Sequence, residues 1–164
     1  LDGALTPRAS DLSLFVEATA TTVGGGPPLQ VMLDAPAPGE YDLFVCGCAP
    51  TYTSADLVSA ALANDTVFAA VNGASLLLPE SDLPAPLTGF AATQEFTWRN
   101  TWIDEMSGAT GPARFIVENA GPQSIELSMA EDGLLVYSLA LAPPGSPLFD
   151  GMSCEPGAET SSTE

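Results

Sequence analysis

Apolar and polar residues alternate most clearly between Gly121 and Leu141. Residues 124–129 place an apolar side chain at every second position, which is the pattern of a strand with one buried face and one exposed face. The acidic turn Glu131-Asp132-Gly133 comes next, and a second apolar run follows it directly. Two such runs around a short turn predict a β-hairpin. A hairpin alone buries too little surface to be stable, so the rest of the chain is expected to supply further strands and a facing sheet.

Shorter runs of strand character fill the chain before this stretch. Prolines and glycines separate them, and they cover residues 12–20, 29–33, 40–49, 65–71, 74–78, 92–102 and 113–118. Asn72-Gly73 predicts a turn that pairs 74–78 with 65–71. In 40–49, alternation places Tyr41, Leu43 and Val45 on one face and Asp42, Phe44, Cys46 and Cys48 on the other. The run 54–63 instead spaces its apolar residues as a short helix does. Many short strands with turns at close intervals predict an all-β fold, an antiparallel two-sheet β-sandwich of the jelly-roll type. We expect the sandwich over residues 12–142, an N-terminal arm at 1–11, and a C-terminal tail at 143–164 that packs on the domain or on a neighbour.

The charge balance is strongly acidic. The 164 residues include 21 Asp and Glu against three Arg, with no Lys and no His, for a formal net charge of −18. Phosphate binding needs a basic surface, so nucleic acid is not an expected partner. Although 46% of the residues are hydrophobic, no apolar run reaches the roughly 18 residues that span a bilayer. Membrane insertion is therefore not expected either.

Three cysteines, Cys46, Cys48 and Cys154, make an odd set. Cys46 and Cys48 lie two apart on a predicted strand and therefore point to the same face, where a bond between them would be strained. We expect one of the two to pair with Cys154 and hold the tail against the sheet, while the other stays free or bonds to another molecule. Three reduced, buried thiols are the alternative. A disulfide and the N-glycosylation sequon at Asn64 both favour an extracellular or cell-surface location.

Aromatic residues are the main candidates for binding, because a flat ring suits the C–H face of a sugar and needs no charge. Trp102 follows a polar stretch beside a loop and is expected to be exposed. Trp98 alternates with Phe96 and is expected in the core, and Phe90 is a further aromatic candidate. The sugar-stacking candidates are therefore Trp102, Tyr52 and Phe44, with packing in the core or against a subunit as the alternative.

Catalysis is not expected from this composition. Without His and Lys the common general bases and catalytic triads are absent, which leaves carboxylates. The adjacent acids Glu131-Asp132 and Asp104-Glu105 lie in predicted turns, where a solvated side chain is the ordinary outcome. No cofactor is required. Calcium is the ion that we consider for such oxygen ligands, with Glu17, Asp104 and Glu105 as its candidate ligands, and plain solvation of the acidic loops is the alternative.

The order of the predicted strands resembles the carbohydrate-binding modules of the galactose-binding-like jelly-roll type, over about residues 12–142. The most specific segment is SMAEDGLLVYSLAL at 128–141, which is similar to the Arg-Glu-Asp-Gly-Leu segment and closing strand of those modules. This chain has Ala130 in place of the arginine and Tyr137 in place of an aspartate, and Glu17 remains of the carboxylates that typically hold calcium. The resemblance implies a jelly roll, with sugar and calcium as the family's ligands.

Two functions fit these observations. In the first, the chain is a non-catalytic structural subunit of a secreted or cell-surface assembly, such as a filament or sheath, and its copies form a homo-oligomer or homopolymer. The arm at 1–11 would then add a strand to the sheet of the next copy, as in donor-strand complementation. A charged content of only 15%, the altered family positions and the spare cysteine favour this hypothesis. In the second, the chain is an extracellular glycan-binding module with carbohydrate as its partner.

Overall fold

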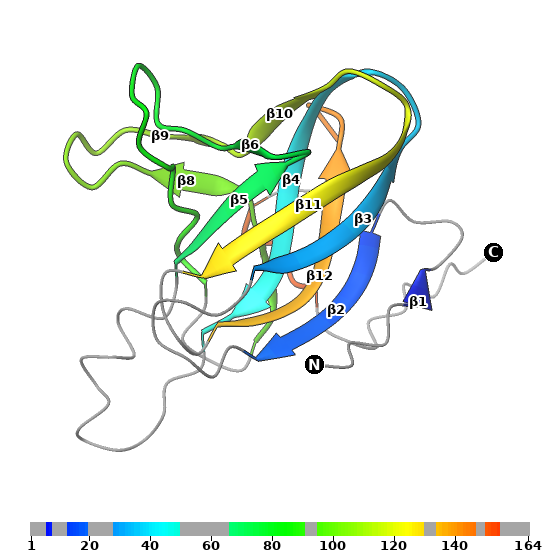
Figure 1. Ribbon diagram of the computed structural model, residues 1–164. Helices are drawn as coiled ribbons and strands as arrows, with labels where there is room; N and C mark the ends of the chain where they lie inside the picture. The colour runs from blue at the N-terminus through cyan, green and yellow to red at the C-terminus, as the bar shows by residue number, and fades with distance from the viewer. Residues whose placement is uncertain are drawn as a thin grey trace.

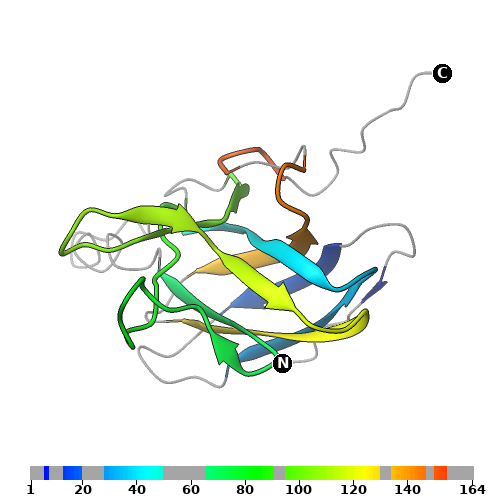
Figure 2. The same cartoon turned by 90° about the horizontal axis from the view of Figure 1, so that it is seen from above.

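Two antiparallel sheets packed face to face make up most of the structure (Figure 1). The computed structural model describes residues 6–7, 13–19, 28–49, 66–90, 95–129, 134–146 and 150–154. Within these ranges there are strands, turns and loops but no helix, hence none long and apolar enough to cross a membrane. The view from above shows the two sheets as separate layers (Figure 2). The predicted helix at 54–63 lies outside the described residues.

Each sheet is built from strands that are far apart in the sequence. The larger sheet has the order β1-β2-β12-β4-β10. Strand β7 pairs with the same edge of β4 as β10 does, but β10 lies along the first half of β4 and β7 along the second half. Its strands are β1 Thr6–Pro7, β2 Ser13–Thr19, β12 Leu135–Ala142, β4 Gly39–Cys48, β10 Arg114–Val117 and β7 Thr97–Arg99. The smaller sheet has the order β3-β11-β5-β6, with β3 Leu29–Ala35, β11 Gly121–Met129, β5 Val67–Val71 and β6 Ala74–Ser75. A separate pair consists of β8 Thr101–Ile103 and β9 Thr110–Pro112.

The chain changes sheet at almost every step. It passes from the larger sheet in β2 to the smaller in β3, back in β4 and across again in β5, and it repeats this from β10 through β11 to β12. This alternation is the topology of a jelly roll, so the predicted all-β sandwich is confirmed. Two residues of the predicted arm, Thr6 and Pro7, pair with β2 of their own sheet.

The hairpin predicted over 121–141 is wrong. The first strand, β11, lies between β3 and β5, whereas the second, β12, lies between β2 and β4 in the opposite sheet. The two strands are neighbours in sequence, yet each is central in its own sheet and buries its apolar face against the other layer. Both edges of each strand are paired in this arrangement.

A hairpin does form at Asn72-Gly73, as the sequence predicted. It joins β5 to β6, with Ala70 opposite Ser75 and Val71 opposite Ala74. Both turn residues have positive φ, 51° for Asn72 and 81° for Gly73, which is the geometry of the type I′ turn that Asn-Gly favours.

Strand β4 is buried on both faces. The alternating pattern predicted which residues share a face, but it did not predict that both faces are buried. Tyr41, Leu43 and Val45 face the main core between the sheets. The opposite face carries Phe44, which forms a second apolar cluster with Ala140 and Ala142 of β12. Because Cys46 and Cys48 are fully buried as well, β4 has no exposed face from residue 41 to 48.

A β-bulge in β12 shifts the alternation of that strand. Val136 and Leu139 are three residues apart, yet both point into the main core. Against β4 the register shifts between Val136 and Ser138 so that β12 has one extra residue, Tyr137, whereas against β2 the extra residue lies in β2. The apolar side chains before and after the bulge therefore point into the same core.

The two tryptophans occupy the reverse of their predicted environments. Trp98 of β7 is half-buried and packs edge-on against Phe44 in the outer cluster, with ring centroids 6.5 Å apart. Trp102 of β8 is 8% exposed and belongs to the main core. Its indole N–H donates to the carbonyl of Pro112 at 3.1 Å, and its ring covers Gly111, the residue opposite it in β9. A glycine at that position leaves the space that the indole fills.

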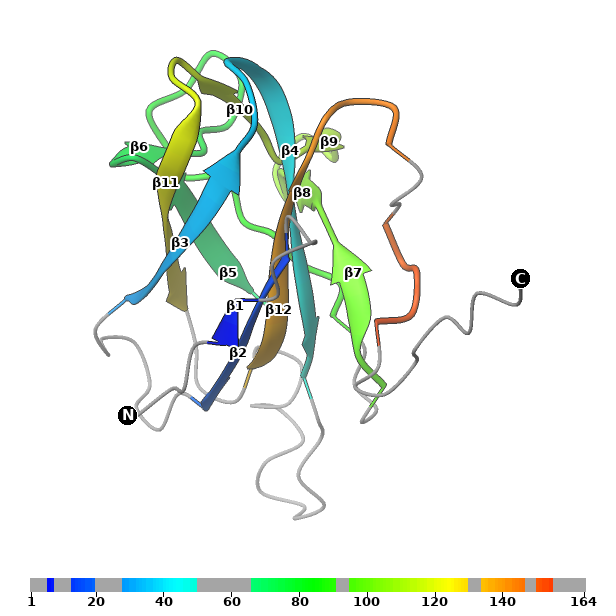
Figure 3. The same ribbon diagram turned by 90° about the vertical axis from the view of Figure 1, so that its right-hand side faces the viewer.

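The C-terminal segment 150–154 forms an extra edge beside β7 (Figure 3). Trp98 donates its backbone N–H to the carbonyl of Met152 at 2.8 Å and accepts from Gly151 at 2.6 Å. Asp150 binds Arg99 at 3.0 Å and also accepts the backbone N–H of Asn100 at 2.8 Å.

A disulfide holds the end of this segment. Cys154 is bonded to Cys46 of β4, which is one of the two pairings that the sequence left open, and Cys48 is free and buried. Burial raises the pKa of the Cys48 thiol, so the thiol form is favoured at neutral pH. The segment 150–154 is therefore attached to the larger sheet by a covalent link as well as by hydrogen bonds.

Replacing Gly111 by alanine is expected to destabilise the domain by about 1–3 kcal/mol, the usual cost of overpacking. The added Cβ would lie 2.5 Å from Cζ2 of Trp102. Urea denaturation measures the loss. Phenylalanine lacks the indole atoms that would collide, so Gly111→Ala combined with Trp102→Phe should cost less than the sum of the two single changes. A Gly111→Ala variant as stable as the wild type would contradict this packing.

Removing the disulfide with Cys154→Ser is expected to lower the free energy of unfolding by about 2–5 kcal/mol. The bond links residues 108 apart, so it restricts a large part of the unfolded chain. A reducing agent should cause the same loss in the wild type and no further loss in the variant. Cys48→Ala is the matched control, because it keeps the bond and should keep the sensitivity to reduction. A Cys154→Ser variant with wild-type stability would overturn the expectation.

Candidate functional site

The predicted sugar-stacking residues in the described part of the chain are not available on the surface. Phe44 is 3% exposed beneath Trp98, and Phe90 is buried in the main core together with Trp102. The expectation of an exposed Trp102 was wrong because β8 pairs with β9, and this pairing turns the indole inward over Gly111. Tyr52 and the sequon residue Asn64 lie outside the described residues.

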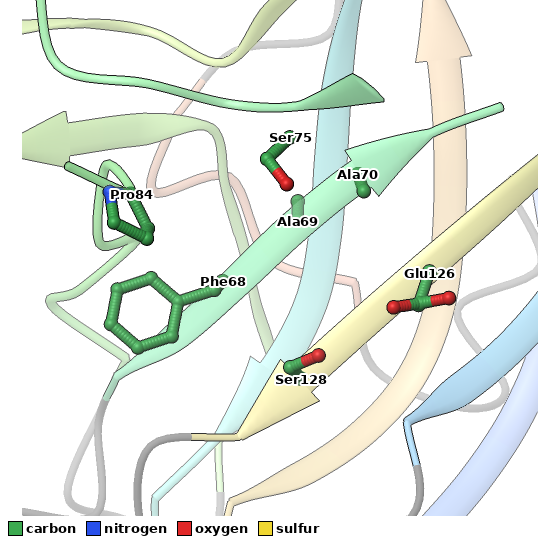
Figure 4. Close-up of a pocket in the computed structure, with 7 residues that line it drawn as sticks. All are labelled: Phe68, Ala69, Ala70, Ser75, Pro84, Glu126 and Ser128. Carbon is green, nitrogen blue, oxygen red and sulfur yellow. The ribbon is translucent and has the colours of Figure 1, made fainter. Parts of the chain in front are cut away.

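An open pocket lies on the outer face of the smaller sheet (Figure 4). Its volume is about 230 Å³. The lining residues come from β5, β6, β11 and the loop after β6, and they are Phe68, Ala69, Ala70, Ser75, Pro84, Glu126 and Ser128. In the close-up, the rings of Phe68 and Pro84 lie toward one side of the pocket, while Glu126 and Ser128 project from β11.

The hollow follows from the residues that the sheet places side by side. Glu126 of β11 is opposite Ala70 of β5, and Ala70 is in turn opposite Ser75 of β6. The small side chain of Ala70 leaves a gap between these two polar neighbours. In the next row Ser128 is opposite Phe68, so the aromatic ring borders the same gap.

A short loop positions the proline at the edge of the pocket. Leu77 and Pro84 form a bridge, and Ala85 donates its backbone N–H to the carbonyl of Leu76 at 2.9 Å. Leu78 donates to Leu83 at the same distance. These backbone hydrogen bonds fold residues 76–85 back along the sheet, which sets the ring of Pro84 beside Phe68.

The turn at the end of β5 is tied to β11, which fixes the relative position of these two strands. Asn72 donates through its side-chain amide to Oε1 of Gln123 at 2.7 Å and accepts the backbone N–H of Ser124 at 2.9 Å. Gln123 is buried and donates to the carbonyls of Asn119 and Gly121. The two strands that carry the pocket are therefore joined by side-chain as well as ladder hydrogen bonds.

Glu126 is the only ionisable side chain among the pocket residues. Its Oε2 accepts a hydrogen bond from the side-chain amide of Gln30 at 3.3 Å. The two arginines in the described part of the chain are engaged elsewhere, Arg99 with Asp150 and Arg114 with Asp42. The third arginine, Arg8, lies outside the described residues. No cation of the described part therefore neutralises the Glu126 carboxylate.

The sequence did not single out these pocket residues. Alternation in 124–129 does predict that Glu126 and Ser128 point outward, and Phe68 and Ala70 alternate with buried valines and alanine in the same way. The pattern does not indicate that β11 pairs with β5. The predicted hairpin assigned β11 a different neighbour, so the two halves of the pocket were not brought together.

The candidate calcium ligands do not form a metal site in the part of the chain that is described. Asp104 begins the β8–β9 turn, where its carboxylate accepts hydrogen bonds from the hydroxyl of Ser107 and the backbone N–H of Met106, and these bonds lower its pKa. Glu105 is exposed in the same turn. Within the described residues no group of three or more acidic, cysteine or histidine side chains is placed to hold a metal ion. The side chain of Glu17 in β2 is outside the description.

Comparison with known proteins gives a structural likeness and no sequence match. No protein-family model matches the chain, and no curated protein sequence does. Among solved structures, the chain is similar to the GH26-CBM35 β-(1,4)-mannanase of Podospora anserina, with a TM-score of 0.41 and 14% sequence identity. The likeness covers 89% of this chain and 27% of the mannanase chain. A likeness of this extent says nothing about what this chain binds.

Proposed function

We propose that the chain is a non-catalytic glycan-binding module whose binding site is the pocket between β5, β6 and β11. The observation that carries the proposal is the combination of the Phe68 ring with three polar side chains, Glu126, Ser75 and Ser128, around one hollow on a sheet face. Few other ligand classes need both a flat apolar surface and several hydrogen-bonding groups without a positive charge.

The chemistry of each group suits a pyranose ring. The face of Phe68 can cover the C–H side of the sugar, while the carboxylate of Glu126 accepts hydrogen bonds from neighbouring hydroxyls. The serine hydroxyls both donate and accept, so they can bind sugar hydroxyls in either sense. The pocket volume of about 230 Å³ is below the roughly 300–1,000 Å³ of enclosed ligand pockets. One ring of an oligosaccharide therefore occupies it, and the rest of the oligomer lies along the open sheet.

The pocket favours binding over turnover. Glycoside hydrolysis uses a pair of carboxyl groups on either side of the bond that breaks. Glu126 stands alone among the pocket residues, and the chain has no His or Lys to replace a second acid. An extracellular setting accords with the Cys46–Cys154 disulfide, because such bonds persist in oxidising compartments.

A structural subunit is the second function that we propose, on the evidence of two edge strands. In the described part of the chain β3 ends the smaller sheet and β10 ends the larger sheet. Each exposes a large apolar side chain, with Met32 54% and Ile116 76% exposed. An unpaired edge that carries an apolar residue is a place where a strand of another copy can add.

Replacing Phe68 by alanine is expected to weaken oligosaccharide binding at least about fivefold, if loss of the stacking ring costs a sugar as much as it costs a stacked nucleobase, about 1–3 kcal/mol. Affinity electrophoresis against immobilised neutral polysaccharides, followed by calorimetry on the best ligand, measures the effect. Ile116→Ala is the matched control, since it removes an exposed apolar side chain from the other sheet. Binding that survives Phe68→Ala unchanged would remove the pocket as the site.

If the chain also assembles, Ile116→Lys is expected to suppress that assembly, because a charge on an edge strand opposes strand addition. Removing residues 1–9 should suppress it as well if the N-terminal arm is the connector. Electron microscopy and light scattering of the purified protein and of both variants measure the result. A wild-type protein that remains monomeric at high concentration would exclude the structural function, while polymers formed equally by the truncated chain would exclude the arm.

A further inference from the structure

We propose that the pocket selects hexosamines with a free, protonated amine over neutral and anionic sugars, and that Glu126 is the residue that makes this selection. The inference rests on the proposed function, because it requires that the pocket binds a sugar at all. It adds the chemical class of the ligand, which the shape of the pocket alone does not determine.

The first argument is the unneutralised carboxylate. Glu126 is half-buried in the wall of the pocket, and its recorded hydrogen-bond donor is the neutral amide of Gln30. The described arginines are held in ion pairs with Asp150 and Asp42, so neither is available to Glu126. A ligand that carries its own cation would supply the missing partner. The ammonium group of a hexosamine also offers three donors, enough for the carboxylate and for the hydroxyl of Ser128.

The second argument is the charge of the whole chain. A net charge of −18 on 164 residues produces a negative potential around the molecule, which attracts cations and repels anions. Uronate or sulfated sugars would approach against this potential and then meet Glu126 at close range. Neutral sugars gain nothing from it. Cationic hexosamines gain both from the general field and from the local contact, and the two contributions can be separated by substitution.

The expected selectivity is modest. An ion pair at a partly exposed site changes affinity by up to about fivefold, and salt reduces the effect. Long cationic polymers would bind any strongly acidic protein through many weak contacts, so short oligomers are required. Tetramers of one β-1,4 linkage that differ only at C2 offer a matched series, with a hydroxyl, an acetamido group or an ammonium group at that carbon.

The test titrates wild type, Glu126→Gln, Glu118→Gln and Phe68→Ala with these three tetramers by calorimetry at mildly acidic pH. Glu118 is an exposed acid after β10 that does not line the pocket, so its substitution makes the same change in net charge. The wild type should prefer the ammonium tetramer about three- to fivefold over the hydroxyl tetramer. Glu126→Gln should remove most of that preference and leave only the part that the general field supplies, and Glu118→Gln should retain it. Phe68→Ala should weaken the binding of all three tetramers.

Different failures have different meanings. If the wild type binds the three tetramers alike, or if both glutamate variants lose the preference equally, the selection by Glu126 is overturned while sugar binding in the pocket stands. If no tetramer binds, or if Phe68→Ala has no effect on any of them, the proposed function fails and this inference fails with it. A preference that survives high salt in the wild type would also contradict an ion pair at a partly exposed site.

Discussion

Burial of β4 on both of its faces is the constraint on which the rest of the structure depends. One face packs Leu43 and Val45 into the core between the sheets, and the other packs Phe44 beneath Trp98. A strand in this position cannot tolerate an unpaired charge, so buried Asp42 is bound by Arg114 through two hydrogen bonds of 2.8 and 3.1 Å. The outer side of β4 is thus as well buried as its inner side.

The outer faces of the two sheets differ in this respect. The segment 150–154 lies along β7, the Cys46–Cys154 bond joins its end to β4, and Phe44, Ala140 and Ala142 are buried on the outer face of β4 and β12. The open pocket that Phe68, Ala70 and Glu126 line lies on the outer face of the smaller sheet. The outer face of β4 and β12 therefore contributes to stability, whereas the outer face of the smaller sheet carries the accessible pocket.

Jelly-roll topology also brings together the two strands that carry the pocket. The strands β5 and β11 are neighbours in space but are about fifty residues apart in the chain, and β11 is paired on its other edge with β3. The buried amide of Gln123 connects the β5–β6 turn to β11 through Asn72. Strands paired in this way set the spacing of the side chains that project from them into the pocket.

The sequence by itself determined the fold class, the hairpin at Asn72-Gly73 and the two opposite faces of β4, because these depend on local alternation and on turn chemistry. Only the tertiary structure decided that β11 and β12 lie in different sheets, that Trp102 is buried over Gly111, and that Phe68 and Glu126 share a pocket. Alternation tells which way a side chain points from its strand. It does not tell which strand lies alongside, because pairing is settled by the burial of all the strands at once.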